Sequence, residues 1–330
     1  MKYDVIIPVY NTNKNDLVSC LSSILMQSVI EDVTTIIIDD CSKEKNDDVI
    51  TKFSNLMNIK YIELNENGGV GNARNVGLDN CDGDIIMFCD SDDCFLSPFA
   101  FEIMCKPFKE ENVNITMCSF LEQLDCVNTF NKKQYNLTWL HGKAFRTSFI
   151  KSNNIKFPTF RYNEDVGFNL LCWSCTELDN IIYNDDSVHI WRSNPNSITR
   201  SQDSGYKNDG LFNFVEAYNW YLAQCKERNI LNIKFVKDQV LTNLMMLYWY
   251  AVECRNLYDE NYVAKFDSLC GDYCKMAIDN LTEYVNDENF DITYMNSLQK
   301  CKNVVNRNVP SITIYDWLFK LAKEKDIRLS

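Results

Sequence analysis

Three carboxylates lie within four positions of the segment FCDSDD, at Asp90, Asp92 and Asp93. The run before them, from Asp84 to Cys89, is typical of a buried strand. Like charges this close repel one another unless a cation offsets them. Asp90 and Asp92 alternate around Ser91, so in an extended segment both side chains can face the same side. Two hard oxygen donors suit Mg²⁺ or Mn²⁺, which proteins often share with phosphates, so the cluster predicts a divalent cation bound to a diphosphate.

A second candidate site for a charged ligand lies upstream, where the breaker Gly68–Gly69 opens a helix. The free N–H groups of a helix start favour an anion. Arg74 lies about one turn further on and can offer a planar cation to a phosphate or a base. Plainer interpretations remain open: the glycines can be a simple helix-entry turn, and Asp39 or Asp40 a solvated strand end or helix cap.

Alternating strand and helix patterns in the first hundred residues are expected to position these side chains. The expected strands are Tyr3–Val9, Val33–Ile38, Ile59–Leu64 and Asp84–Cys89. The expected helices are Asp16–Gln27, Asp47–Met57 and a segment ending at Leu78. Such alternation predicts a parallel sheet with helices on both faces, and ligands gather beyond the carboxyl ends of such strands. The polar loops at those ends are Tyr10–Asn11, Asp39–Asp40, Asn65–Gly69 and Asp90–Asp93.

The rest of the chain changes character twice. Residues 114–198 mix short strands with loops, and from about Tyr206 the pattern is helical. We therefore expect one domain over residues 1–205 and a helical region over 206–330 that packs against it. The apolar stripe around Leu244 and Leu247 is expected to be core.

Composition narrows the class of protein. The 330 residues are 46% hydrophobic and 24% charged, enough for a large core, and the net charge is −13. An acidic surface repels phosphate backbones, so general nucleic-acid binding is disfavoured. A signal peptide is not expected, because Asp4 and Pro8 interrupt the first apolar run. The fifteen cysteines are then expected to be reduced and to pack as small hydrophobic side chains.

The cellular location follows from hydropathy. The sequence has no apolar stretch approaching the about 20 residues of a membrane-spanning helix. We expect a cytoplasmic protein. The last helix, near Ile314–Lys325, leaves open a peripheral contact with the inner face of the membrane, although a terminal helix docked on its own domain is favoured.

Several motifs together resemble the GT-A-fold, family 2 glycosyltransferases. These are IIPVYN, IIIDDCS and NGGVGNARNVGLDNCDGDIIMFCDSDD, followed by HGKAFRTSFI, NED and WRSNPNSITR. The resemblance covers roughly residues 1–200. It implies an α/β, GT-A (Rossmann-like), mostly parallel sheet flanked by helices that binds a nucleotide-sugar. The C-terminal helical region carries no recognised motif, and acceptor binding or oligomerisation is expected there.

The resemblance and the loop positions together give a set of candidate ligand contacts. The expected substrate-binding residues are Pro8, Val9, Tyr10, Asp40, Gly68, Arg74, Asp90, His141, Lys143, Glu164, Arg192 and Ser197. Among them, Asp40 is implied to bind uracil and Asp90 the ribose hydroxyls. Cys41 departs from the glycine usual in the second loop. His141 either borders the donor or is an ordinary loop histidine, and His189 is expected to be a packed strand residue.

The remaining roles concern the reaction itself. The resemblance implies that Asp92 binds the metal and that Asp165 is the catalytic base, with Arg192 and Ser197 in a segment that closes over the diphosphate. A metal and an arginine can stabilise the charge that forms on a leaving diphosphate. One carboxylate base opposite the leaving group gives inversion without an enzyme nucleophile. We therefore predict transfer of a hexose or N-acetylhexosamine from a UDP-sugar to a glycan or lipid-linked acceptor.

Other functions remain open. A nucleotidyltransferase also places carboxylates and a metal beside phosphates, but it would release pyrophosphate. A sugar-nucleotide-binding scaffold would be unaffected by Asp165→Asn. A transferase acting on modified bases in DNA would need a basic groove, for which the candidates are Lys132, Lys133, Lys143, Arg146 and Lys151. Homo-oligomerisation is possible, and the sequence identifies neither the sugar nor the acceptor.

Overall fold

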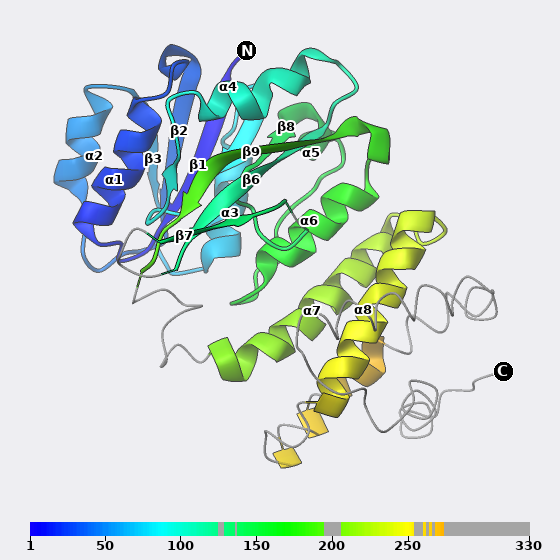
Figure 1. The fold of residues 1–330 in the computed structure, drawn as a ribbon. Coiled ribbons are helices and arrows are strands. Elements are labelled where there is room, and N and C mark those ends of the chain that lie inside the picture. The colour runs from blue at the N-terminus through cyan, green and yellow to red at the C-terminus, as the bar shows by residue number, and fades with distance from the viewer. Residues whose placement is uncertain are drawn as a thin grey trace. The chain divides into compact units, whose positions relative to one another are not determined.

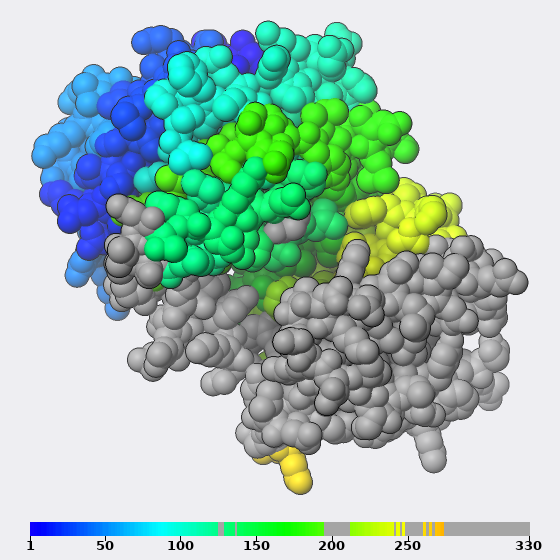
Figure 2. All heavy atoms as spheres, in the orientation of Figure 1, coloured from blue at the N-terminus to red at the C-terminus, as the bar shows by residue number. Residues whose placement is uncertain are grey.

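The structure is a computed structural model that describes residues 1–124, 129–135, 137–194, 206–253, 260–261, 264–265 and 268–273. The chain divides into two compact units, Met1–Tyr206 and Lys207–Ser330. The first unit holds the sheet, and its segments fill one continuous surface in the space-filling view (Figure 2). Helices α7 (Tyr206–Glu227) and α8 (Lys234–Glu253) make up most of the described part of the second.

A nine-stranded sheet forms the centre of the first unit, in the order β3-β2-β1-β4-β8-β6-β9-β5, with β7 paired to β6 (Figure 1). The strands are β1 Tyr3–Val9, β2 Val33–Asp39, β3 Asn58–Glu63, β4 Ile85–Phe88, β5 Cys94–Phe95, β6 Ile115–Gln123, β7 Phe130–Lys133, β8 Lys143–Arg146 and β9 Ile181–Trp191. The helices are α1 Lys14–Leu25, α2 Asp47–Ser54, α3 Val70–Asp79, α4 Ala100–Cys105, α5 Thr147–Ser152 and α6 Glu164–Ser174. Short 3₁₀ helices span Ile30–Asp32, Lys106–Lys109 and Leu178–Asn180.

The sheet is parallel in its first half and mixed in its second. Strands β1 to β4 pair in parallel, as the alternating pattern predicts. Strand β8 is antiparallel to both β4 and β6, and β9 returns parallel to β6. The predicted α/β class is confirmed. The part beyond β4 departs from a parallel sheet because β8 follows β6 and β7 and runs antiparallel to both β6 and β4.

Both faces of the sheet are covered by helices. Val5 and Ile7 of β1 belong to one buried cluster with Leu21 of α1 and Met104 of α4. The alternate residue Ile6 lies on the other face, where it leaves room only for Gly77 of α3. Period-two alternation therefore gives β1 two buried faces, as expected for a central parallel strand.

Pro8 marks the point where β1 leaves its neighbour. The carbonyl of Ile6 accepts the N–H of Cys89, so the even-numbered residues of β1 direct their backbone groups toward β4. The ladder with β4 covers only Tyr3–Ile6, and β4 ends at Phe88. A proline in this central strand therefore removes no ladder hydrogen bond, and the two strands separate here to open the loops described below.

The second unit is helical where it is described. Its buried side chains include Leu222 and Cys225 of α7 and Leu244 and Leu247 of α8. The two leucines of α8 are core residues, as predicted. No described helix of the protein combines the length and the apolar character needed to cross a bilayer. The expected terminal helix near residues 314–325 lies outside the described residues.

Candidate active site

The acidic loop follows β4 at the carboxyl edge of the parallel strands. It is a turn and not the extended segment predicted from the sequence, because the N–H of Asp93 donates to the carbonyl of Asp90 at 3.0 Å. The hydroxyl of Ser91 shares a hydrogen bond of 2.7 Å with Thr12. In this turn Asp90 and Asp92 are still close enough for the charge of Asp90 to raise the pKa of Asp92.

Asp90 and Asp92 have opposite electrostatic surroundings. Asp90 accepts a hydrogen bond from Nη2 of Arg74 at 2.7 Å. Burial acts to raise the pKa of Asp90, but the charge and hydrogen bond of Arg74, together with the charges of His141 and His189, hold that pKa below its usual value. Asp92 forms no ion pair with any described residue, and it accepts a hydrogen bond from Nδ2 of Asn194 at 2.8 Å. Burial, and then the charge of Asp90, raise the pKa of Asp92.

Asp92 therefore fits the role of a metal ligand better than Asp90 does. Its carboxylate is partly exposed and has no cationic partner among the described side chains. Burial and the charge of Asp90 both raise its pKa and so disfavour its ionised form, an effect that a bound cation would offset. Carboxylate oxygen is the donor that Mg²⁺ and Mn²⁺ prefer, so the residues present suit such an ion.

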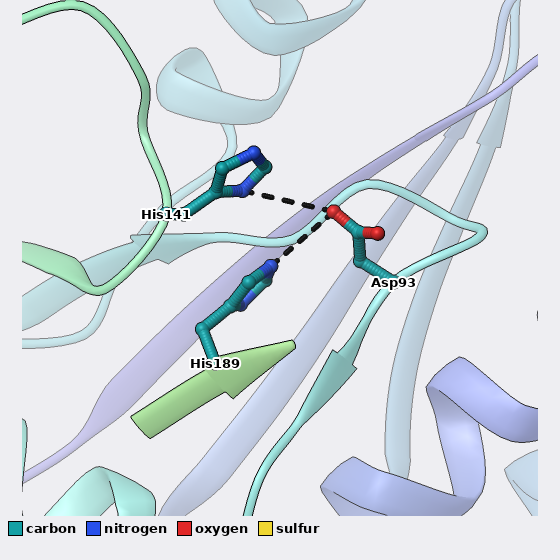
Figure 3. A group of neighbouring side chains, drawn as sticks. All are labelled: Asp93, His141 and His189. Carbon is teal, nitrogen blue, oxygen red and sulfur yellow. Dashed lines mark hydrogen bonds and ion pairs between the residues drawn. The ribbon is translucent and has the colours of Figure 1, made fainter. Parts of the chain in front are cut away.

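Asp93 lies at the centre of a buried cluster with both histidines of the chain (Figure 3). Its Oδ2 lies 3.3 Å from Nε2 of His189 and 3.6 Å from Nδ1 of His141. Its Oδ1 accepts the backbone N–H of Arg192 at 2.9 Å. Burial raises the pKa of Asp93 to about 7, against the hydrogen bond from His189. His189 is fully buried in β9, as predicted.

The donor atoms of this cluster lie within 4.8 Å of one another, close enough to hold a metal ion. However, the two imidazole rings are stacked, with centroids 4.7 Å apart and planes inclined by 24°. A bound metal lies in the plane of each imidazole that ligates it, and nearly parallel rings have no such common point between them. As arranged, His189 ties the acidic loop to β9 through a hydrogen bond, and His141, in the loop before β8, lies beside the same carboxylate.

Arg192 follows β9 and lies against the acidic loop. Its Nη1 is 3.1 Å from Oδ1 of Asp16 and 3.2 Å from the carbonyl of Asp92. The guanidinium is therefore next to the predicted metal ligand, where it can reach a phosphate, and Asp16 holds it there. Its predicted companion Ser197 lies outside the described residues.

Asp40 and the glycine turn bind each other. The N–H groups of Gly68 and Gly69 each donate to Asp40 at 2.8 Å. The anion expected at this helix start is thus the carboxylate of Asp40. Asp39 points elsewhere, toward the backbone N–H of Ser42 and the hydroxyl of Tyr61. Asp40, and not Asp39, is therefore the aspartate that contacts the glycine turn.

The turn around Asp40 keeps its shape despite the unusual cysteine. Cys41 adopts the left-handed conformation, with φ of 62°. Glycine adopts that conformation without strain, which explains its usual presence in the related motif. Beside this turn, Pro8 and Val9 are buried at the end of β1, whereas Tyr10 is 48% exposed and free to face a ligand.

Glu164 and Asp165 open helix α6 and have different surroundings. Glu164 is buried and pairs with Nη1 of Arg74 at 2.5 Å. Asp165 is partly exposed, and its Oδ1 accepts the N–H of Val166. Burial, and then the charge of Glu164, raise the pKa of Asp165 to about 8. A carboxyl group with a pKa near neutrality is suited to take up and release a proton.

Lys143 differs from its predicted role at the donor. Its side chain is buried, donates to the carbonyl of Trp139 and lies 5.8 Å above the ring of Trp173. Burial lowers the pKa of its amine to about 7. The amine is enclosed by protein, so a direct contact with a diphosphate would need it to move.

Exposure separates these residues into two groups. Three carboxylates are partly exposed and can meet a ligand: Asp90, Asp92 and Asp165. The residues that hold them are buried: Arg74, Asp93, Glu164 and His189. No sequence pattern predicted a role for Asp93, Asp16 or Asn194, and only the count of three carboxylates in FCDSDD pointed to Asp93.

The fold and the acidic loop place this protein among the GT-A glycosyltransferases. A crystal structure of Staphylococcus aureus TarS 1–349 in complex with UDP-GlcNAc superposes with a TM-score of 0.69 at 18% identity, over 92% of each chain. The pattern of the family described as "Glycosyl transferase family 2" matches residues 4–163. An uncharacterized glycosyltransferase of Haemophilus influenzae is 31% identical over 183 residues, which are 51% of this chain and 70% of that protein. The chain belongs to glycosyltransferase family 2.

A relative with a more specific name matches over a shorter part. The poly(ribitol-phosphate) β-N-acetylglucosaminyltransferase TarS of Staphylococcus aureus is 28% identical over 171 residues. These are 48% of this chain but only 30% of TarS, so the match spans less than a third of that relative.

Proposed function

We propose that this protein is an inverting, metal-dependent glycosyltransferase. It moves a hexose or N-acetylhexosamine from a UDP-sugar to a hydroxyl of a glycan or lipid-linked saccharide. The observation that carries the proposal is the pair of partly exposed carboxylates with raised pKa, Asp92 and Asp165, at the carboxyl edge of the sheet. Asp92 has no cationic partner among the described residues and suits a metal, and Asp165 is poised to exchange a proton.

The donor side of the site is built from the strand ends. Asp92 would hold Mn²⁺ or Mg²⁺, which when bound supplies positive charge to the leaving diphosphate. Arg192, beside Asp92, adds a second positive charge at the same place. Asp40 is 3% exposed and is oriented by two backbone N–H groups, and we place uracil against it, where its remaining lone pairs would accept the imide N–H. Pro8, Val9 and Tyr10 line the adjacent strand end, and Asp90 is the candidate for the ribose hydroxyls.

Asp165 acts on the acceptor side. Its carboxylate takes the proton of the acceptor hydroxyl while the oxygen attacks the anomeric carbon. The bond from that carbon to the β-phosphate oxygen breaks, UDP leaves with the electron pair, and the proton stays on Asp165. Attack opposite the leaving group converts an α-linked donor into a β-linked product. The name of TarS, a β-N-acetylglucosaminyltransferase with a UDP-GlcNAc complex, supports this outcome and an N-acetylhexosamine donor.

The remaining assignments rest on position. His141 lies beside Asp93 of the acidic loop, and Glu164 pairs with Arg74. The backbone N–H of Gly68 orients Asp40. The helical unit Lys207–Ser330 is where we expect acceptor binding or self-association.

The test is UDP release from a panel of UDP-sugars with Mn²⁺, comparing the wild type with Asp92→Ala. Turnover with one preferred donor is expected, and the substitution should abolish it. Asp179→Ala is the matched control, because Asp179 is exposed on a 3₁₀ helix and takes no part in the acidic loop. Release of pyrophosphate in place of UDP, or equal turnover by both aspartate variants, would refute the proposal.

A further inference from the structure

Arg74 joins the two halves of the candidate site. Its Nη2 lies 2.7 Å from Oδ1 of Asp90, in the acidic loop, and its Nη1 lies 2.5 Å from Oε1 of Glu164, next to Asp165. The two carboxylates are separated by 74 positions in the sequence, and a single guanidinium spans them. Because that group is planar with fixed nitrogen positions, it sets the distance and angle between its two partners.

The setting of Arg74 leaves little access for a ligand. The residue is 5% exposed, and its guanidinium lies 5.5 Å from the centre of the Phe157 ring. Both of its terminal nitrogens are already bound to carboxylates. The contact with uracil or diphosphate that the sequence suggested would therefore compete with two charged hydrogen bonds.

Two other residues of α3 contact residues 157–158, which precede α6. Nδ2 of Asn75 donates to the carbonyl of Phe157, and Oδ1 of Asn75 accepts the Phe157 N–H at 2.7 Å. At Gly71, a side-chain carbon would collide with the carbonyl of Pro158 and lie 3.5 Å from Cβ of Glu164. The first turns of α3 thus pack directly on the segment that leads into α6.

We infer that Arg74 is a positioning residue, which acts through Asp90 and Glu164 to hold the donor-side loop and the base-bearing helix in one geometry. This inference rests on the proposed role of Asp165 as the base. It differs from a substrate-binding role, because Arg74 would then act without touching the donor. A misplacement of about 1 Å between reacting groups can slow a reaction about 100-fold, so such a link has a large effect on rate.

The charges of Arg74 and Glu164 also act on Asp165, the proposed base. Burial and the charge of Glu164 raise the pKa of Asp165, and the charges of Arg74 and of Lys143 on β8 lower it. Removing Arg74 would leave Glu164 without its cation and make Asp165 harder to ionise. Removing the charge of Glu164 would have the opposite effect. A purely structural role for Arg74 would not shift the pH profile in these opposite directions.

The experiment compares Arg74→Gln, Glu164→Gln and the double variant, with turnover measured against pH and UDP affinity measured by calorimetry with Mn²⁺. Arg74→Gln should lower kcat about 100-fold with UDP affinity within about twofold of the wild type. Its pH profile should move to higher pH, and that of Glu164→Gln to lower pH. The double variant should regain about tenfold of the lost rate, because the unpaired charge of Glu164 beside Asp165 is then removed, while Asp90 still lacks its cation.

A loss of UDP affinity in Arg74→Gln that the second substitution does not restore would overturn the inference, since Arg74 would then bind the donor itself. Should Arg74→Gln fail to fold, Glu164→Gln decides alone: an unchanged pH profile overturns the inference. Asp165→Asn separates this result from the proposed function. If that variant keeps full turnover, Asp165 is not the base and the proposed mechanism fails, whereas Arg74 variants with wild-type rates refute only the link.

Discussion

Asp165 must lose its own proton before it can accept one from a hydroxyl. Burial and Glu164 raise its pKa to about 8, so at lower pH most molecules carry the proposed base in its protonated form, which cannot accept a proton. The same shift acts on stability. Between the ordinary carboxyl pKa and about 8 the folded state holds a proton that the unfolded chain has released, so this group makes the fold less stable as pH rises through that window.

The first prediction concerns the pH dependence of the rate. The pH dependence of kcat/KM reports the ionisation of the protein before it binds the donor. This ratio should rise about tenfold per pH unit on the acidic side and level off above about pH 8. The measurement is UDP release at low donor concentration from pH 5.5 to 9.5, with Mn²⁺ held constant. The pH-dependence of unfolding is the control for loss of folded protein. A flat profile between pH 6 and 8 would contradict a base with this pKa.

At the scale of elements, the site is assembled where strands end and helices begin. The parallel strands β1, β2 and β4 bring the loops after Val9, Asp39 and Phe88 to one edge of the sheet. Helices α3 and α6 then meet behind that edge, where Gly71 allows the contact. The precision of the site therefore depends on this helix contact as much as on the catalytic side chains.

The second prediction tests that contact. Gly71→Ala should destabilise the fold by about 1–3 kcal/mol, because the added carbon meets the backbone carbonyl of Pro158, which cannot rotate away as a side chain can. It should also lower kcat, since the segment before Glu164 must shift. Urea unfolding and UDP release measure the two effects.

Gly69→Ala is the matched comparison, because that position has open space around it but a φ of 84°. It should lose about 1–2 kcal/mol from backbone strain, without a displacement of α6. Equal turnover in the two variants would show that the contact at Gly71 does not position the base.

Local pattern predicted the first four strands and the three helices between them because each is short and regular. Tyr3–Val9, for example, has the predicted bounds. It also predicted the polar loops at the strand ends, since topology alone brings these together. The turn at Asp90–Asp93 was mistaken for an extended segment, because its closing hydrogen bond is a backbone contact that side-chain alternation does not encode.

Contacts between segments that lie far apart along the chain could not be predicted from the sequence. Asp93 meets His189 only because β5 pairs with β9, in a register where Phe95 lies opposite His189. Arg74 meets Glu164 only because α3 and α6 pack together. Such contacts depend on register and helix packing between segments about 90 residues apart, and a pattern read along one chain contains neither. Arg74 and Lys143 were predicted to contact the donor, and the structure buries both residues.

At the scale of the whole molecule, charge is the dominant feature. The chain carries a net charge of −13, yet its proposed donor is a diphosphate anion. The candidate site resolves this by pairing some carboxylates with Arg74 and leaving Asp92 for a metal ion. The stability of the folded chain should therefore depend on metal and nucleotide together, because each supplies the charge that the other lacks.

The third prediction follows from this dependence. Mn²⁺ with UDP should stabilise the wild type, by about 2.7 kcal/mol when the ligands are at 100 times their Kd, and Asp92→Asn should lose that gain. Without ligands the variant should be at least as stable as the wild type, because it no longer holds a partly buried charge that has no ion pair among the described residues, and its amide oxygen can still accept from Asn194. Thermal unfolding with neither ligand, either one and both measures this, with Asp179→Asn as the control on the same chain. Equal stabilisation of Asp92→Asn and the wild type would show that Asp92 does not hold the metal.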